Sequence, residues 1–229
     1  MNNNKRNQCL GQRVTNNQGQ TGVIVDYVNC YEVHVKFDAT GWVGRFEMGN
    51  ITSGKLKDKL SPSVYGVGYI GDGEHVTSKN NKRTHAYIIW YNMLKRCYCP
   101  KNHKKQPTYA GCTVAEEWHN FQNFAEWHEA NYPKDGGSYD LDKDALVTGN
   151  KEYGPSTCRF LTHQQNTEAS QAKHYWVTSP KGEQIKVFNL KKFCRENDLN
   201  AGVLYQVAQG NFKHHKGWTA PKQEIDDDD

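Results

Sequence analysis

YDLDKDALVTGNKEYGPSTCRFLTHQQN, residues 139–166, is the stretch whose pattern decides the expected fold. It reads as a strand, a turn rich in Gly, Asn and Pro, a return strand and a helix that carries Asn166. In such a ββα unit the first strand lies against the helix, so Asp142 and Asn166 are expected to approach a common point. The predicted elements are 139–144, 147–156, 157–161 and a helix from about Thr162.

Two side chains of this unit offer the oxygen atoms that a hard divalent cation prefers. Asp142 would supply a carboxylate and Asn166 an amide oxygen. A small cation such as Mg²⁺ keeps several waters and takes its remaining ligands from a substrate phosphate, so few protein ligands are needed. The pattern therefore predicts a one-metal nuclease site with Mg²⁺, or Mn²⁺, as its cofactor.

Residues 86–166 resemble the core of the phage HNH homing endonucleases, which belong to the His-Me finger nucleases with a ββα-metal fold. In that family an acidic residue on the first strand and an Asn on the helix hold one divalent cation, and these positions fall on Asp142 and Asn166. The resemblance implies metal-dependent cleavage or nicking of double-stranded DNA. It is carried by Trp90, Met93, Arg96, Cys97, Tyr109, Cys112, Glu117, Trp118, Phe121, Phe124, Leu141, Asp142, Tyr153, Cys158 and Arg159.

The family has a His beside the acidic residue to activate the attacking water, and this chain has Lys143 there. Two side chains are candidates to replace it. Lys143 qualifies if burial near the metal favours its neutral form. His163 lies three residues before Asn166 and so close to the same helix face. Arg159 is expected near the phosphate.

Alternatives to this assignment stay open. The alignment also permits a shift by one position, in which Asp142 takes the His position and Asp144 is the remaining acidic ligand. The missing His leaves a second class of function, a nuclease-dead DNA-binding regulator or architectural protein. A third is a protein-docking module, whose binding would not weaken steeply with salt as phosphate contacts do.

The C-terminal tract, residues 171–222, is rich in positive charge. It holds nine Lys or Arg residues against three acids, which is an electrostatic footprint for a polyanion. The formal net charge of the chain is +4, and the four terminal Asp residues contribute −4, so the remainder carries +8. Double-stranded DNA is the partner that this charge favours.

The same tract has the pattern of a helix-turn-helix. Residues 175–179 and 184–188 flank a Pro-Lys-Gly turn as a hairpin, Asn189 is placed to cap a helix, and Gly210 ends a second helix. Such a second helix enters the major groove. The motifs VTSPKGEQ, NLKKFCREN and HHKGW in this order resemble the DNA-binding tail of the same family. The predicted DNA contacts are Lys191, Lys192, Arg195, Asn200, Tyr205, Gln206, Gln209, Lys213, His214, His215 and Lys216.

The N-terminal part has strand patterns and the central part has helix patterns. Residues 22–27, 31–37 and 42–48 are short β-branched and aromatic runs that predict a small SH3-like barrel. Apolar residues at helical spacing from Ala86 to Cys97 predict a helix. A second helix, to about Asn131, is expected to start with a capping box at residues 113–116.

The overall prediction is a modular α+β chain. We expect a small β-barrel at 1–59, a linker at 60–84, an HNH-like ββα-metal domain at 85–170, a helix-turn-helix module at 171–222 and an acidic tail at 223–229. No apolar run approaches the ~18 residues that span a bilayer, so the expected location is the cytoplasm, that of a host cell if a phage encodes the chain. Seven cysteines at irregular spacing argue against a disulfide framework. Zinc at Cys97, Cys99, His103 and Cys112 is not expected, because their spacing matches none of the usual knuckles.

Overall fold

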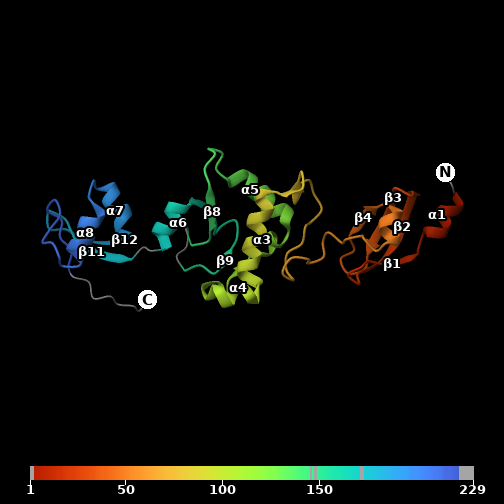
Figure 1. Cartoon of the computed structure of the whole chain (residues 1–229), viewed down its shortest axis with the longest axis horizontal. Coiled ribbons are helices and arrows are strands. Elements are labelled where there is room, and N and C mark those ends of the chain that lie inside the picture. The colour runs from red at the N-terminus through yellow and green to blue at the C-terminus, as the bar shows by residue number, and fades with distance from the viewer. Residues whose placement is uncertain (1–2, 145, 147–148, 171–172, 222–229) are drawn as a thin grey trace. The chain divides into compact units, whose positions relative to one another are not determined.

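The computed structural model describes residues 3–144, 146, 149–170 and 173–221, and its elements are of mixed α and β type (Figure 1). The chain forms two compact units. The first unit is Met1–Tyr132 with Leu146–Arg159, and the second is Pro133–Ala145 with Phe160–Asp229. The acidic tail, 223–229, and two residues of the predicted turn, Val147 and Thr148, lie outside the described residues. Within the described part, no helix is long and apolar enough to cross a membrane.

The first unit begins with a four-stranded antiparallel sheet in the order β1-β2-β3-β4. Alternation along β3 buries Val33, Val35 and Phe37, as period-2 patterning requires. The elements are α1 (Asn3–Cys9), β1 (Arg13–Thr15), β2 (Thr21–Asn29), β3 (Glu32–Phe37), β4 (Val43–Phe46) and α2 (Met48–Thr52).

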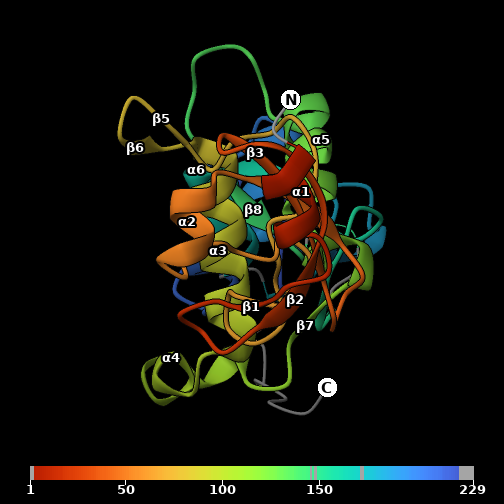
Figure 2. The same cartoon turned by 90° about the vertical axis from the view of Figure 1, so that its right-hand side faces the viewer.

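The expected closed barrel is not seen, because the described strands form an open sheet. Cys9 of α1, Ile51 of α2 and Leu56 join the same buried cluster as the strand residues. Helix α1 lies against β2 (Figure 2). The prediction of β strands at this place is therefore confirmed, whereas the described strands show no closed barrel.

The helical part of the first unit is built on the packing of α3 against α5. Trp90 is fully buried and donates its indole N–H to the backbone oxygen of Trp118 at 2.7 Å. Phe121 packs on Trp90 with ring centroids 5.4 Å apart. The elements are β5 (Ser78–Lys79), β6 (Lys82–Arg83), α3 (His85–Tyr98), α4 (Pro100–Lys105), η1 (Pro107–Tyr109), β7 (Thr113–Val114), η2 (Glu116–His119), α5 (Phe121–Asn131) and β9 (Glu152–Tyr153).

The predicted capping box at 113–116 is absent. Thr113 and Val114 form β7 and pair in parallel with β9, so their backbone is committed to a ladder and not to a helix start. The cap of α5 is Asn120 instead, whose side chain accepts from the backbone N–H of Gln122 at 3.0 Å. The helix itself and its end at Asn131 agree with the sequence pattern.

Part of the segment 60–84, which composition predicts as a linker, is hydrogen-bonded to the helical part. The backbone of Tyr69 donates to His119 at 2.9 Å and accepts from Phe121 at 2.9 Å. The Gln122 side chain donates to the backbone oxygens of Ile70 and His75. A Gly-rich composition does not exclude such contacts, because backbone groups can bond whatever their side chains are.

His128 gives the first unit a testable pH dependence. Burial, and then the neighbouring His85, whose Nδ1 lies 3.0 Å from His128 Nε2, lower the pKa of His128 from 6.5 to about 4. Between these values the unfolded chain binds more protons, so stability falls as pH falls through this window. The wild type should therefore lose free energy of unfolding between pH 7 and 4.5. We expect the His128→Phe variant to lose about 1–2 kcal/mol less over this range, a figure that allows for the partial exposure of His128.

Urea unfolding of the full chain at the two pH values measures this difference. The phenylalanine keeps a ring against Tyr132, which stacks on His128 with centroids 5.0 Å apart. If the wild type and the variant lose the same free energy of unfolding between the two pH values, the lowered pKa of His128 is contradicted.

The second unit contains the ββα segment and the C-terminal hairpin with its two helices. Its elements are β8 (Tyr139–Asp142), β10 (Arg159–Thr162), α6 (His163–Ser170), β11 (His174–Thr178), β12 (Gln184–Phe188), α7 (Leu190–Glu196) and α8 (Ala201–Ala208). Strand β8 is shorter than predicted, since the side chain of Asp142 accepts from the backbone N–H of Asp144 at 2.8 Å and turns the chain there. The C-terminal core is Val177, Val187, Leu190, Cys194, Leu204 and Val207.

Candidate functional site

Strand β8 presents two carboxylates on one side. Leu141 and Lys143 are buried, while Asp140 and Asp142 are partly exposed. Since successive side chains of a strand point to opposite faces, Asp140 and Asp142 share a face. Strand β8 pairs with β10, and α6 lies against β8. The second unit therefore has the predicted ββα order.

Helix α6 has a reciprocal cap that fixes where it starts. The hydroxyl of Thr162 accepts from the backbone N–H of Gln165 at 3.1 Å, and the Gln165 side chain accepts from the backbone N–H of Thr162 at 3.0 Å. Thr-x-x-Gln is the sequence form of a capping box. His163 is consequently the first residue of the helix.

His163 meets β8 at Asp140. Its Nδ1 lies 3.3 Å from Oδ2 of Asp140, and its side chain is 91% exposed. Asp140 was not among the residues that the sequence singled out. Period-2 spacing from Asp142 was the signal that could have found it. A carboxylate on one nitrogen of an imidazole fixes which nitrogen is left to accept a proton.

Lys143 and Asp144 bond to each other. The ammonium nitrogen of Lys143 lies 2.8 and 2.7 Å from the two carboxylate oxygens of Asp144. The Lys143 side chain is 9% exposed and that of Asp144 is 47% exposed. The Lys143 ammonium is therefore engaged by the carboxylate of its neighbour Asp144.

The remaining predicted residues are Asn166 and Arg159. Asn166 is partly buried on α6, three residues after His163 and so on a neighbouring part of the helix surface. Arg159 is the exposed first residue of β10.

Asp142 on β8 and Asn166 on α6 both carry side-chain oxygen atoms. A carboxylate from Asp142 and an amide oxygen from Asn166 are ligand types that Mg²⁺ accepts with waters completing its shell. Among the described residues, no three or more His, Cys, Asp or Glu side chains gather as a metal site.

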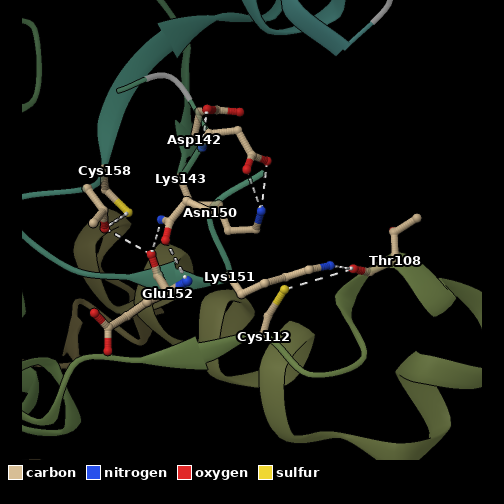
Figure 3. Close-up of polar contacts among 10 residues, drawn as sticks. Thr108, Cys112, Asp142, Lys143, Asn150, Lys151, Glu152 and Cys158 are labelled. Atoms are coloured by element: carbon tan, nitrogen blue, oxygen red, sulfur yellow. Dashed lines mark hydrogen bonds and ion pairs between the residues drawn. The ribbon is translucent and has the colours of Figure 1, made fainter. Parts of the chain in front are cut away.

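The cysteines considered for zinc have other contacts. Cys97 and Cys112 are buried, and their thiols donate weakly to the backbone oxygens of Thr113 and Thr108. Figure 3 shows Cys112 and Lys151 both directed to Thr108.

Helix α6 is joined to α7 by an ion pair within the second unit. Both guanidinium nitrogens of Arg195 lie 3.2 Å from the Glu168 carboxylate. Donation from Arg195, and then from Gln164, holds the pKa of Glu168 below its usual value. Arg195 was predicted to contact DNA, and the structure places it on Glu168.

The cap of α7 agrees with the sequence prediction, whereas Asn200, which was predicted to contact DNA, caps α8. Asn189 accepts from the backbone N–H of Lys192 at 3.0 Å, and Asn200 accepts from that of Val203 at 3.1 Å. The hairpin and the positive φ of Gly210 also agree with the predictions.

Two predicted phosphate contacts hold the turn between α7 and α8. His215 Nε2 accepts from the backbone N–H of Asn200 at 3.0 Å. The Lys216 ammonium donates to the backbone oxygen of Asp198 at 2.6 Å and to its carboxylate at 3.1 Å. Lys213 and His214 are exposed beside them.

Tyr205 and Lys191 line one hollow of about 340 Å³ on the second unit, together with Lys173. Tyr205 of α8 is 44% exposed, and Gln209 follows one turn later, also exposed.

Gln206 is partly buried and accepts from the side chain of Asn211 at 2.6 Å. Lys192 is exposed and lies 3.9 Å from Glu196. A hollow lined by an aromatic ring and two lysines suits a polyanion with flat bases.

No protein-family model matches the chain, and no curated protein matches it. A solved structure described as "DNA binding and cleavage by the HNH homing endonuclease I-HmuI" aligns with 20% identity over 45% of this chain and 69% of that chain. The TM-score is 0.22. A function for this chain is therefore argued from its own residues.

Proposed function

We propose that the chain is an HNH-like, metal-dependent endonuclease that binds double-stranded DNA. The observation that carries the proposal is the geometry of β8 and α6. Asp142 lies on the face of β8 that also carries Asp140, and Asp140 is paired with His163 at the start of α6. An acidic ligand and an oriented imidazole on adjoining elements are what phosphodiester hydrolysis requires.

Asp142 and Asn166 would hold Mg²⁺ or Mn²⁺. When bound, such an ion neutralises charge that develops on the phosphate and on the departing oxygen. Asp144 is the less suitable ligand, because both its oxygens already accept from Lys143. Arg159 would add a positive charge near the phosphate.

His163 would act as the general base. With the Nδ1 proton directed to Asp140, Nε2 is left with a lone pair that can take a proton from water. Asp140 then stabilises the imidazolium that forms, as a carboxylate does in other His-based catalysts. His163 is exposed and accessible to a substrate, whereas Lys143 is buried and ion-paired.

The C-terminal module would bind the DNA as a helix-turn-helix, with α8 in the major groove. Tyr205 in that helix and Gln209 just after it are exposed. Lys191, Lys192 and Lys213 are exposed cations for phosphate contacts. His215, Lys216 and Arg195 would serve mainly to hold the module in shape.

The test uses the full chain, supercoiled DNA, and Mg²⁺, Mn²⁺ or EDTA. Cleavage with either metal that stops with EDTA is expected. Binding should weaken steeply as salt rises, because phosphate contacts release counterions. Salt-sensitive binding without cleavage would instead identify a DNA-binding regulator. That function is favoured by Lys143, which stands where the HNH homing endonucleases have their catalytic His. Absence of DNA binding would refute both.

A further inference from the structure

Residues 55–59 of the first unit carry a lysine at every second position. Lys55 and Lys57 are exposed, Lys59 is partly exposed, and the intervening Leu56 and Asp58 are buried. This alternation is that of an extended chain with one face in the core. The side chains of Lys55 and Lys57 therefore leave the chain on one side, and we name Lys55, Lys57 and Lys59 together the lysine row.

The backbone of the lysine row is fixed by its buried neighbours. Leu56 is 1% exposed in the core of the sheet, and its backbone oxygen accepts from the side chain of Asn16 at 3.0 Å. The Asp58 carboxylate accepts from the hydroxyl of Thr40 at 2.6 Å and from the backbone N–H of Leu60 at 2.9 Å. A site on such a rigid segment loses little conformational entropy when it binds.

The lysine row borders a groove of about 1220 Å³. Two of the acids in this groove are already engaged. Asp58 accepts the two bonds just given, and Asp72 accepts from Lys59 at 2.9 Å and from the indole N–H of Trp42 at 3.3 Å. The basic and aromatic residues that line it are Lys55, Lys57, Lys59, Arg45, His34, Trp42, Phe46 and Tyr87.

Two lysines of the groove, Lys55 and Lys57, have no acid partner among the described residues. Lys59 is different, because its ammonium bonds Asp72 and lies 5.7 Å from the Trp42 ring centroid. The groove thus carries two exposed positive charges, on a fixed backbone, that no described acid compensates.

We propose that this groove binds the phosphate backbone of double-stranded DNA, through Lys55 and Lys57, as a contact additional to that of the C-terminal module. Alternate residues of an extended chain lie about 6.6 Å apart, which suits successive phosphates of one strand. Charge complementarity is the argument for this occupant. The identification of the polyanion as DNA rests on the proposed function.

The experiment measures the affinity of the full chain for a DNA duplex over a range of salt concentrations. The variants are K55Q/K57Q, K191Q/K192Q, and K101Q/K104Q as a control with the same charge change on exposed residues of α4. We expect K55Q/K57Q to lower the slope of log K against log salt by about 1 for each lysine that no longer meets a phosphate, roughly 2 in all. The control should keep the wild-type slope.

A second measurement needs no variant. Lysines of the wild type are methylated with and without DNA, and bound DNA should protect Lys55 and Lys57 more than Lys101. The inference is overturned if K55Q/K57Q has the same slope as the control and DNA does not reduce the methylation of Lys55 and Lys57 in the wild type. If K191Q/K192Q alone lowers the slope, the proposed function stands and this inference falls. If the wild type fails to bind DNA, both fall.

Discussion

Asp142→Ala is expected to abolish metal-dependent cleavage, lowering the rate roughly 100-fold or more. A metal that stabilises charge on a reacting phosphate contributes several kcal/mol, and each 1.36 kcal/mol is a factor of about ten in rate. Loss of the only carboxylate ligand that we assign would remove this contribution. The measurement is the single-turnover rate of nicking of supercoiled DNA at saturating Mg²⁺.

Asp144→Ala is the matched control, because it removes a carboxylate two residues away. Asp144 is bound by Lys143 on both oxygens, so we expect its loss to change the rate less than about tenfold. An inactive Asp144 variant would instead favour the alignment shifted by one position, in which Asp144 is the acidic ligand and Asp142 takes the His position.

His163 can be tested in the same assay without relying on loss of activity alone. His163→Gly should lower the rate by about 10²–10⁴-fold, the usual contribution of a positioned general base. Added imidazole should restore part of that rate, which a variant that is merely misfolded would not show. Asp140→Asn should have a smaller effect, since Asp140 acts through His163. If Lys143→Gln is inactive and His163→Gly is not, the base is Lys143.

The residues that carry the family resemblance are mostly core residues. Ten of them are buried: Trp90, Met93, Cys97, Cys112, Trp118, Phe121, Phe124, Leu141, Tyr153 and Cys158. A pattern of buried residues reports how a chain packs. It says little about whether Asp142 and His163 perform chemistry, and this is why the ββα order was predictable while the activity requires an assay.

Local signals predicted local structure well. The Asn189 cap, the hairpin of β11 and β12, and Gly210 at the end of α8 each depend on residues close in the chain. The capping box at residues 113–116 failed for a physical reason. Its Thr113 pairs with Glu152, which is distant in sequence, and this ladder overrides the local preference.

Contacts between distant side chains were not predictable from pattern. Periodicity tells which face of β8 carries Asp140, but not that His163 of α6 reaches it. Likewise, a basic residue such as Arg195 reads as a phosphate contact until Glu168 is placed beside it. Basic composition therefore overestimates the cations that are available to DNA.

Trp90→Ala is expected to destabilise the first unit by about 3–5 kcal/mol, the range for truncating a large buried aromatic residue. Trp90 is 0% exposed and packs between Phe121 and Tyr87, with ring centroids 5.4 and 5.8 Å away. Trp90→Phe keeps a ring but leaves the backbone oxygen of Trp118 without its indole donor, at a cost of about 1–3 kcal/mol. Chemical denaturation followed by circular dichroism gives both values, and a destabilisation below about 1 kcal/mol in the alanine variant would contradict this packing.

Gly68→Ala tests whether the Gly-rich segment 60–84 is packed on that same Trp or is a free linker. A Cβ at Gly68 would lie 2.8 Å from Cζ2 of Trp90 and would also collide with Leu94. Because both neighbours are fully buried, they cannot easily move, and overpacking of this kind costs about 1–3 kcal/mol. Gly49→Ala is the control, since nothing lies within 4 Å of its added Cβ. If the segment is a free linker, both substitutions should be tolerated equally. If it is packed, only Gly68→Ala should destabilise the first unit. The Gly-rich segment would then help to hold Trp90 in place, although its composition alone indicates a flexible linker.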